Sequence, residues 1–352
     1  MGITIKTIAE ELGVAPSTVS NALTGRSKGA YPKAVARLDR IRMYAEKRGY
    51  RPNAAARAVR SQRTYQVGVL VPNRAGHATT HPNTFEGILG INNGLQSSGY
   101  IVSIIRFDDL TQDVASHTRL FSEEALDGLI VLGHYPDWAI PKLESLVSNI
   151  VWMDTDVWRD HGCIRRDEAA AGRKVVEQAA SLGYRRVIWL GYPDNKNFSH
   201  YSHEARRTAA IEAAEELGLA FDQRAFISWE WEKRENRISE GLSPDGVVVA
   251  ESAYHAQTMA NHAMSRGMTA PRDFGLACCD GAREIDRVWP GLSRVNFDRF
   301  AMGCAAAEML REMLDGKDDR VASKLTGGDW VAGSTACKVS GAGPVWPSAT
   351  QR

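Results

Sequence analysis

Four short polar side chains near the start of the chain have a spacing suited to hydrogen bonding from one face of a helix. They are Ser17, Thr18, Ser20 and Asn21, and the apolar Val19, Ala22 and Leu23 are interleaved with them. A helix here turns its apolar residues inward and its hydroxyl and amide groups outward. Such groups can bond base edges or phosphates in the major groove of DNA. The pattern predicts a DNA-reading helix, and a solvated helical hairpin is the alternative, because helix-turn-helix spacing has many false positives.

Two further helices are expected to hold this one in place. Apolar residues recur at helical spacing in the preceding stretch, at Ile5, Ile8, Ala9 and Leu12. Gly13 permits a tight turn, and Pro16 suits the first position of the second helix. A third helix is predicted from about Lys33 to Arg48, closed by Gly49, with its apolar residues turned inward. Those residues are Val35, Leu38, Ile41 and Ala45.

Basic residues follow the helical pair in two segments. The loop from Thr24 to Pro32 contains Lys28 and could follow a phosphate backbone. Asn53 can cap a short Ala-rich helix from Ala54 to Arg60 that is too short to be stable alone. Its arginines, with Arg63 beyond, suggest a segment that becomes helical beside DNA and a second copy of the chain. An ordinary flexible linker is the alternative.

The charge of the chain is divided unevenly along its length. Residues 1 to 63 contain 13 Lys and Arg against 4 Asp and Glu, a net charge of +9, whereas the whole chain is +1, which leaves −8 for the rest. A polyanionic partner is therefore expected for the first part only. With 352 residues, the chain is long enough for two or three domains.

Several classes of protein are disfavoured by composition. No apolar run approaches twenty residues and no export leader begins the chain, so neither membrane insertion nor export is expected. The five cysteines have no metal-ligand spacing, which favours reduced thiols in a cytoplasmic protein. No cofactor-binding motif is present.

Apolar runs alternate with helical stretches after Gln66. The expected strands are Val67 to Val71, Ile101 to Ile105, Gly128 to Leu132, Ile150 to Met153, Val187 to Leu190, Gly246 to Ala250 and Phe274 to Cys279. The expected helices lie around Phe85 to Ser98, Glu168 to Leu182, Ala205 to Leu217 and Ala256 to Arg266. Strict alternation of this kind predicts parallel sheets covered on both faces. A break near Asp156 to Arg166 suggests two similar lobes, one after the other, facing a cleft.

Polar and aromatic residues follow the predicted strands, at the edge where ligands of such sheets bind. The candidates for a ligand site are Asn83, Thr84, Asp154, Arg206, Trp231, Glu251 and Asp280, with His200 and Tyr201 nearby in the chain. Carboxylates, a guanidinium and flat rings suit a hydroxylated ligand such as a sugar. Each residue also has a plainer explanation, because an Asp after a strand is often a helix cap.

An enzyme is the competing class. The chain lacks a phosphate-loop glycine pattern, GxSxG, HExxH and metal-ligand clusters. Catalysis would need another arrangement of residues such as His134, Asp154 and Asp280. We therefore expect no enzymatic activity.

Residues 4 to 23 and the segment GYRPNAAARAVRSQRTYQVGVLVPN, from Gly49 to Asn73, resemble the signature of the lactose-repressor (LacI) family of bacterial transcription regulators. The resemblance continues through ALDGLIVLG, LGYRRVIWLG, Ser202 to Arg206, SPDGVVVA and Asp273 to Gly281. It implies a helix-turn-helix head, a hinge helix and a body similar to type I periplasmic sugar-binding proteins. That body would form a homodimer and bind a small effector, while the dimer would bind a pseudo-palindromic operator.

The resemblance also assigns roles to individual residues. Ser17, Thr18 and Asn21 match DNA-contacting positions, and Val59 matches a leucine that wedges into the minor groove. The complete set expected to bind DNA is Thr4, Lys6, Ser17, Thr18, Ser20, Asn21, Lys28, Asn53, Arg57, Val59 and Arg60. Arg206 and Asp280 match residues that bond effector hydroxyls, and Asp154 and Trp231 fall near effector positions.

Departures from the family pattern concern specificity. Asn21 replaces a frequent arginine and suits adenine rather than guanine. Ala15 replaces a serine cap, and Val59 is a smaller wedge than leucine. Glu251 stands where the family often has Asn, which favours hydroxyl-rich or cationic groups over anionic ones.

The sequence therefore predicts a small all-α head joined to an α/β body of two parallel-sheet lobes. The expected domains are a DNA-binding head (1–51), a hinge helix and linker (52–64), an effector-binding and dimerisation body (65–340) and a C-terminal tail (341–352). The expected effector is a sugar or sugar derivative, and a purine or nucleoside is the alternative.

Overall fold

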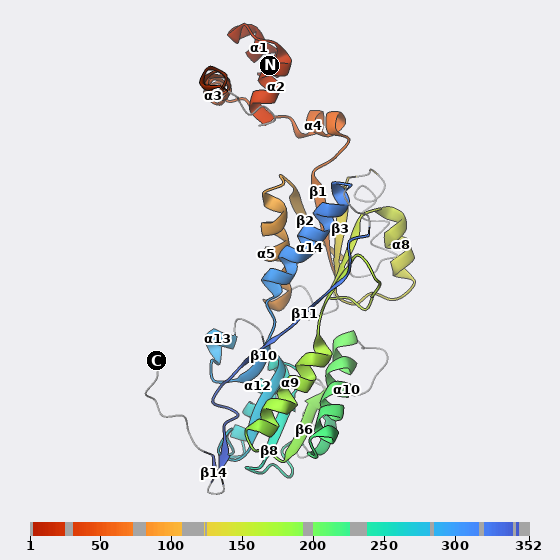
Figure 1. The fold of residues 1–352 in the computed structure, drawn as a ribbon, viewed down its shortest axis with the longest axis vertical. Helices are drawn as coiled ribbons and strands as arrows, with labels where there is room; N and C mark the ends of the chain where they lie inside the picture. Colours follow the sequence, from red (N-terminus) through yellow and green to blue (C-terminus); the bar gives the residue numbers. More distant parts are fainter. Residues whose placement is uncertain are drawn as a thin grey trace. The chain divides into compact units, whose positions relative to one another are not determined.

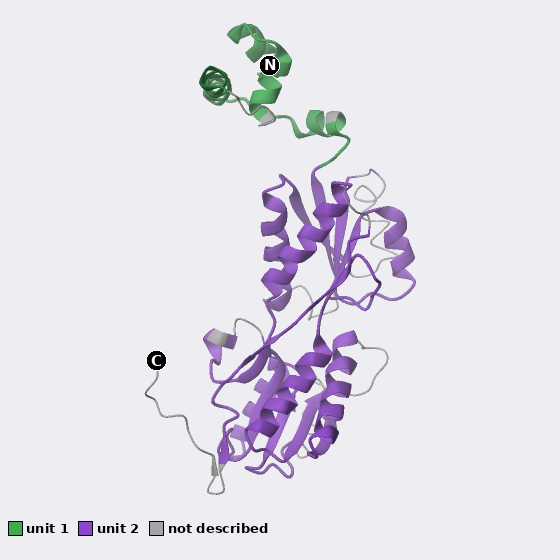
Figure 2. Ribbon diagram, in the orientation of Figure 1, with its two compact units in different colours: residues 1–64 green, residues 65–352 purple. Residues whose placement is uncertain are grey.

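The computed structural model describes residues 3–24, 31–72, 82–107, 123, 125–192, 200–225, 238–281, 285–316, 320–340 and 343–344. Contacts between residues divide the chain into two units, Met1–Thr64 and Tyr65–Arg352 (Figure 2). Each unit has its own hydrophobic core, so each is described by itself.

The first unit contains α1 (Ile5–Leu12), α2 (Pro16–Thr24), α3 (Pro32–Lys47) and α4 (Ala54–Ser61). The first three helices share a small core formed by Ile8, Ala9, Val19, Ala22, Leu38, Ile41 and Ala45. Gly13 ends α1 in the left-handed region, with φ +64°, which a residue without a Cβ adopts at no steric cost. The Nε of Arg42 donates to the carbonyl of Ala22 at 2.9 Å, so α3 also caps the end of α2.

The prediction that Val35 of α3 is buried in the core is wrong. Val35 is 44% exposed, whereas Leu38, Ile41 and Ala45 are buried as expected. The described core of the first unit includes α3 residues only from Leu38 onward, and the first turn of α3 lies outside it.

The second unit begins with a parallel sheet in the order β11-β5-β4-β3-β1-β2. The strands are β1 (Gln66–Pro72), β2 (Ile101–Phe107), β3 (Gly128–Leu132), β4 (Ile150–Met153), β5 (Cys163–Arg166) and β11 (Lys324–Thr326). One face packs against α5 (Pro82–Gln96) and α14 (Arg299–Leu314), and the other against α8 (Ala139–Leu146). Together these elements form the first lobe (Figure 1).

The second lobe has a sheet in the order β12-β10-β9-β8-β6-β7. Its strands are β6 (Arg186–Gly191), β7 (Ala220–Ala225), β8 (Gly246–Ala250), β9 (Gly275–Gly281), β10 (Ser293–Asn296) and β12 (Asp329–Val331), of which β12 alone runs antiparallel to its neighbour. α9 (Glu168–Ser181) and α10 (Tyr201–Glu216) cover one face, and α12 (Ala253–Met264) covers the other. The short α13 (Ile285–Val288) follows β9, and β13 (Val339–Ser340) pairs with β14 (Gly343–Pro344). The predicted α/β class with two parallel-sheet lobes is confirmed.

The two lobes are not consecutive in sequence, so that part of the prediction is wrong. The chain enters the second lobe after β5, returns to the first lobe for α14 and β11, and crosses again to β12 (Figure 1). The two strands flanking the late crossing, β11 and β12, have three residues each and lack an apolar run, so periodicity does not reveal them. As a result, residues far apart in sequence meet where the lobes face each other.

α5 and α14 pack so closely that their backbones touch. A Cβ on Gly303 of α14 would lie 2.1 Å from the carbonyl oxygen of Gly87 in α5, and a Cβ on Gly90 would lie 2.1 Å from that of Phe300. Only glycine fits such an approach. This contact fixes the start of α14, and with it Arg299, against the first lobe.

No helix in the described ranges combines the length and the apolar character needed to span a bilayer. All five cysteines are free, and four of them are buried. Burial raises the pKa of the Cys278 thiol to about 12.

Candidate functional site

The outer face of α2 carries the polar side chains expected to bind DNA. Ser17 and Asn21 are exposed, and Thr18 and Ser20 are half-buried. Val19 and Ala22, on the opposite face, are fully buried in the core of the first unit. The hydroxyl and amide groups therefore project from a helix whose orientation is fixed by packing.

The other predicted DNA-binding residues lie at helix starts or on the hinge helix. Thr4 caps α1, where its Oγ1 accepts from the backbone N–H of Thr7 at 3.2 Å, and Lys6 is exposed. The Oδ1 of Asn53 accepts from the N–H of Ala55 at 2.9 Å and so caps α4. On α4, Arg57 is half-buried and Val59 is 81% exposed. Lys28 and the side chain of Arg60 lie outside the described residues.

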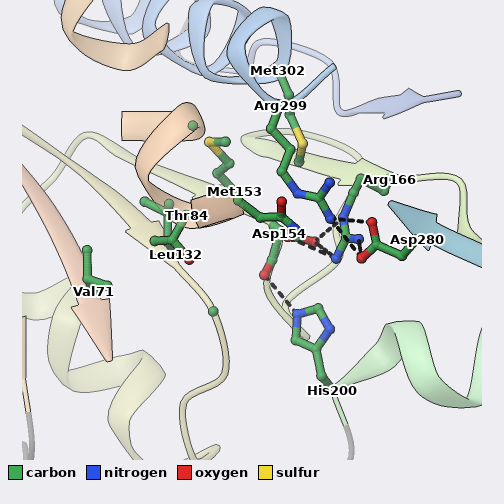
Figure 3. Close-up of a pocket in the computed structure, with 13 residues that line it drawn as sticks. Val71, Thr84, Leu132, Met153, Asp154, Arg166, His200, Asp280, Arg299 and Met302 are labelled. Carbon is green, nitrogen blue, oxygen red and sulfur yellow. Dashed lines mark hydrogen bonds and ion pairs between the residues drawn. The ribbon is translucent and has the colours of Figure 1, made fainter. Parts of the chain in front are cut away.

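A cavity of about 200 Å³ lies between the lobes of the second unit (Figure 3). Its wall comes from the carboxyl ends of β1, β3, β4 and β9, from the last residue of β5 and from the starts of α5 and α14. The lining residues are Val71, Asn83, Thr84, Gly87, Leu132, Gly133, Met153, Asp154, Arg166, His200, Asp280, Arg299 and Met302. This position matches the rule that ligands of parallel sheets bind beyond the carboxyl ends of the strands.

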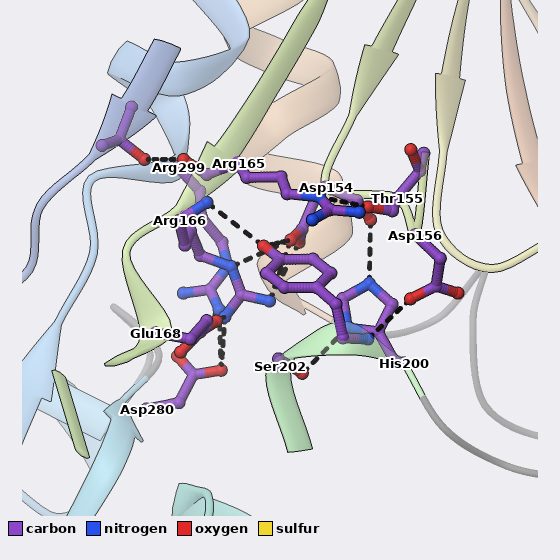
Figure 4. A network of polar contacts seen from close by, with 12 residues as sticks. Asp154, Thr155, Asp156, Arg165, Arg166, Glu168, His200, Ser202, Asp280 and Arg299 are labelled. Carbon is purple, nitrogen blue, oxygen red and sulfur yellow. Dashed lines mark hydrogen bonds and ion pairs between the residues drawn. The ribbon is translucent and has the colours of Figure 1, made fainter. Parts of the chain in front are cut away.

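Asp154 and Arg166 form the centre of the polar wall (Figure 4). Asp154 follows β4 with φ +56°, a left-handed conformation that Asp tolerates better than most residues. Its Oδ1 accepts from the Nε and Nη2 of Arg166, both at 3.1 Å, and from the hydroxyl of Tyr201 at 2.7 Å. The left-handed turn thus directs the carboxylate toward both groups.

Asp280, at the end of β9, receives guanidinium groups from three sides. Arg299 donates to both of its oxygens, at 2.7 and 2.8 Å, Arg166 at 2.9 Å and Arg206 at 3.0 Å. Glu168 accepts from Arg206 and pairs with Arg166 on the side away from the cavity. Three arginines and three carboxylates therefore compensate one another in a buried network.

The charges of this network lower the pKa values of Asp154 and Asp280. Burial alone would raise the pKa of Asp154, but Arg166, His200 and Arg299 outweigh it and hold that pKa well below its usual range. Arg299, Arg206 and Arg166 have the same effect on the pKa of the buried Asp280. Apart from His200, the ionisable residues of the described cavity wall are two aspartates and two arginines, whose formal charges sum to zero.

Glu251 belongs to a second polar cluster, behind the cavity wall. Its carboxylate contacts the Nδ1 of His203 and accepts from the backbone N–H of Tyr192 at 2.8 Å. The ring of Tyr192 meets those of His203 and His255 edge-on, with centroids 5.0 and 4.7 Å apart. Burial and the nearby Arg206 lower the pKa of each histidine to about 3. Both imidazoles are therefore neutral at neutral pH.

Residues at the start of α10, in the second lobe, form hydrogen bonds with the first lobe. The Nε2 of His200 lies 2.9 Å from the carbonyl oxygen of Asp154, and the backbone N–H of Tyr201 donates to Asp156 at 2.6 Å. His134, after β3, contacts the other oxygen of Asp156. The loop after β4 is thus the first lobe's main polar contact with α10.

The structure brings together only part of the predicted effector site. Asn83, Thr84, Asp154 and Asp280 line the cavity. Arg206 and Glu251 are buried behind its wall, where Arg206 donates to the carbonyl of Glu251 at 3.1 Å. Trp231 lies outside the described residues, and no Phe, Tyr or Trp of the described chain lines the cavity, so the expected ring stacking finds no support in the described residues.

Two lining residues, Arg166 and Arg299, were missed by the sequence reasoning. Arg166 ends a four-residue strand, CIRR, that lacks an extended apolar run, and Arg299 begins α14, a helix that was not among those expected from the sequence. A signal was nevertheless present, because each arginine stands next to an acidic residue at the start of a helix: Asp167 before α9 and Asp298 before α14.

Comparisons with known proteins agree with this architecture. A family model described as a periplasmic binding protein-like domain matches residues 176–336. The chain is 25% identical to the HTH-type transcriptional regulator GntR of Pseudomonas aeruginosa over 321 residues, 90% of this chain and 91% of that protein. It is 22% identical to the ribose operon repressor of Lactococcus lactis over 316 residues, 87% of this chain and 90% of that protein.

Among solved structures, the fold is similar to that of the Lac repressor dimer bound to operator and the anti-inducer ONPF. The TM-score is 0.72 at 17% identity, covering 96% of this chain and all of that one. The similarity to transcription regulators extends from the helical head to the end of the second lobe. These findings agree, over about nine tenths of the chain, with the resemblance to the lactose-repressor (LacI) family of transcription regulators.

Proposed function

We propose that the chain is a repressor that binds a pseudo-palindromic operator as a cytoplasmic homodimer and changes its DNA affinity when a neutral, hydroxyl-rich effector occupies the inter-lobe cavity. A sugar or sugar derivative is the proposed effector. The gating is thermodynamic, since an effector shifts the equilibrium between two states by its difference in affinity for them.

The observation that carries the effector proposal is the charge balance of the cavity wall. In the described part of the wall, the formal charges of two arginines and two aspartates sum to zero, which gives an anionic ligand little net attraction, while Asn83 and Thr84 add amide and hydroxyl groups. Such a wall suits a ligand that both donates and accepts hydrogen bonds. The relative named as a ribose operon repressor supports the same class of ligand.

The purine or nucleoside alternative has less support. A flat base is held best by an aromatic side chain, and the described part of the wall offers only the imidazole of His200. We therefore favour a sugar over a nucleoside.

The DNA-binding part of the proposal depends on the first unit. We propose that residues 1–51 form the reading head, that 52–64 form the hinge, that 65–340 form the effector-binding and dimerisation body, and that 341–352 are a tail. The exposed polar face of α2 and the exposed Val59 of α4 support this division. The net charge of +9 in residues 1 to 63 supports a polyanionic partner.

A thermal-shift screen of the full chain against neutral sugars, sugar acids and nucleosides tests the effector class. A neutral sugar should raise the unfolding midpoint, because a ligand of the folded state stabilises it. Thr84→Val removes one lining hydroxyl at nearly constant volume and should reduce that rise. Thr258→Val, on the outer face of α12, is the matched control. Stabilisation by sugar acids alone, or equal shifts in both variants, would contradict the proposed site.

A further inference from the structure

Arg166 is the only residue of the described chain whose side chain pairs with Asp154 of the first lobe and with Asp280 and Glu168 of the second. It is the last residue of β5, directly before the chain crosses into the second lobe, and it is 5% exposed. All three guanidinium nitrogens donate: Nε and Nη2 to Asp154, and Nη1 to Asp280 at 2.9 Å. Nη1 also forms an ion pair with Glu168 at 2.6 Å. One planar group thus joins the two lobes.

Tyr201 strengthens the same junction. Its hydroxyl donates to Asp154 at 2.7 Å and accepts from the backbone N–H of Arg166 at 3.2 Å. The tyrosine belongs to α10 of the second lobe, whereas Arg166 ends β5 and Asp154 directly follows β4, both strands of the first lobe. Both the backbone and the side chain of Arg166 therefore form hydrogen bonds with residues of the second lobe (Figure 4).

The network leaves little of Asp280 available to a ligand. A carboxylate has about four lone-pair sites. The Oδ2 of Asp280 already accepts one hydrogen bond each from Arg299, Arg166 and Arg206, and its Oδ1 accepts one from Arg299. A hydroxyl that binds Oδ2 must therefore displace a guanidinium. The same applies to the Oδ1 of Asp154, which accepts from Arg166 twice and from Tyr201.

We propose that Arg166 is an internal bridge that holds the two lobes together without a ligand, so that an effector competes with its guanidinium instead of closing an open cleft. Asp154 and Asp280 face each other across the lobe boundary, and in a low-dielectric site they repel unless a cation lies between them. The chain supplies that cation itself. Effector binding then weakens or rearranges an existing bridge.

Chemical rescue of Arg166→Ala tests the bridge. Truncation removes the guanidinium and leaves the carboxylates of both lobes facing its empty space. The unfolding midpoint should fall by roughly 6 °C or more, because breaking a buried ion pair is strongly destabilising. Ethylguanidinium chloride at about 50 mM should recover at least half of that loss, by binding where the side chain was. Equal concentrations of NaCl and ethylammonium chloride should recover much less, since neither has the planar fork.

The matched control is Arg173→Ala. Arg173 forms a two-point ion pair with Glu216, but it is exposed and lies entirely within the second lobe. Its truncation should leave the midpoint nearly unchanged and unresponsive to ethylguanidinium. Rescue of both variants alike, or of neither, would overturn the proposal.

A distance measurement separates a bridge from a merely stabilising side chain. Spin labels at Ser145 on α8 and Glu215 on α10, both exposed, place one probe in each lobe. A Cys304→Ala background removes the one cysteine that is not fully buried, and excess unlabelled chain isolates the distance within a protomer. The ligand-free chain with Arg166 intact should give one narrow distribution of label-to-label distances. Arg166→Ala should broaden that distribution, and ethylguanidinium should restore the narrow one. If Arg166→Ala keeps the narrow distance, the lobes do not depend on this residue and the proposal fails.

Discussion

Lowering the pH should destabilise the second unit through its buried histidines, and His255 offers the cleanest test. Its side chain is fully buried beside Tyr192 and Tyr254, and burial with the nearby Arg206 lowers its pKa to about 3. In the unfolded chain, a histidine has a pKa of about 6.5. Between these two values, the unfolded state binds a proton that the folded state does not. Stability is therefore complete above about pH 6.5 and is lost as the pH falls toward 3.

The size of the effect follows from these two pKa values. At pH 5.5, protonation lowers the free energy of the unfolded state by about 1.4 kcal/mol for one such histidine, and at pH 7.5 by less than about 0.1 kcal/mol. His203, with its pKa also lowered to about 3, adds a similar contribution. Because its side chain is 29% exposed, solvent reduces that contribution, and we base the test on His255.

Urea unfolding followed by tryptophan fluorescence measures the effect. All nine tryptophans lie beyond residue 137, so the signal reports the second unit only. His255→Gln keeps a polar side chain but cannot become protonated. The variant should lose about 1.4 kcal/mol less than the wild type between pH 7.5 and pH 5.5. His161→Gln, at an exposed histidine, is the control and should follow the wild type. The same loss in His255→Gln as in the wild type would refute the reasoning.

Two other predictions concern packing and the hinge. Gly303→Ala should destabilise the chain by about 2–3 kcal/mol, because its Cβ would lie 2.1 Å from the carbonyl oxygen of Gly87. Gly327→Ala, in open space, is the control and should cost little stability. Chemical unfolding measures both variants, and equal losses of stability would contradict the close contact. Val59→Ala keeps the helix propensity of α4 but shortens the exposed side chain. The variant should therefore bind a selected operator more weakly, with a smaller effect on binding to random DNA. Gel-shift titrations measure both affinities, and equal weakening would rule out a wedge at this position.

The fold was largely predictable wherever the chain buries continuous apolar runs. β1, β3 and β8 are such runs, and their burial on both faces follows from helices covering each side of the sheet. β5, β11 and β12 have only three or four residues and are stabilised by neighbours distant in sequence, so no local pattern reveals them. The return of the chain to the first lobe was missed because α14, a 16-residue helix, was not among the expected helices.

The candidate site was predictable only at positions at or just after the end of an apolar strand, or at the start of the next helix. Asp154 follows β4, Asp280 is the last residue but one of β9, and the structure places both in the cavity wall. The sequence does not indicate that Arg206 faces away from the cavity, because its direction depends on pairing with Glu168, 38 positions earlier. Arg166 was missed because its role depends on two carboxylates from different lobes, which meet only after the chain has crossed between them.

The most direct test of the account is the coupling between the inter-lobe cavity and DNA. The full chain would be titrated, by fluorescence anisotropy, against a pseudo-palindromic duplex selected from a random library, with and without the sugar that stabilises it most. We predict that affinity falls steeply with salt, is lost on deletion of residues 1–64, and changes by about 5- to 150-fold with the sugar. Thr84→Val should reduce that change while leaving affinity without sugar nearly intact. DNA affinity that no stabilising ligand alters would contradict an effector-gated regulator.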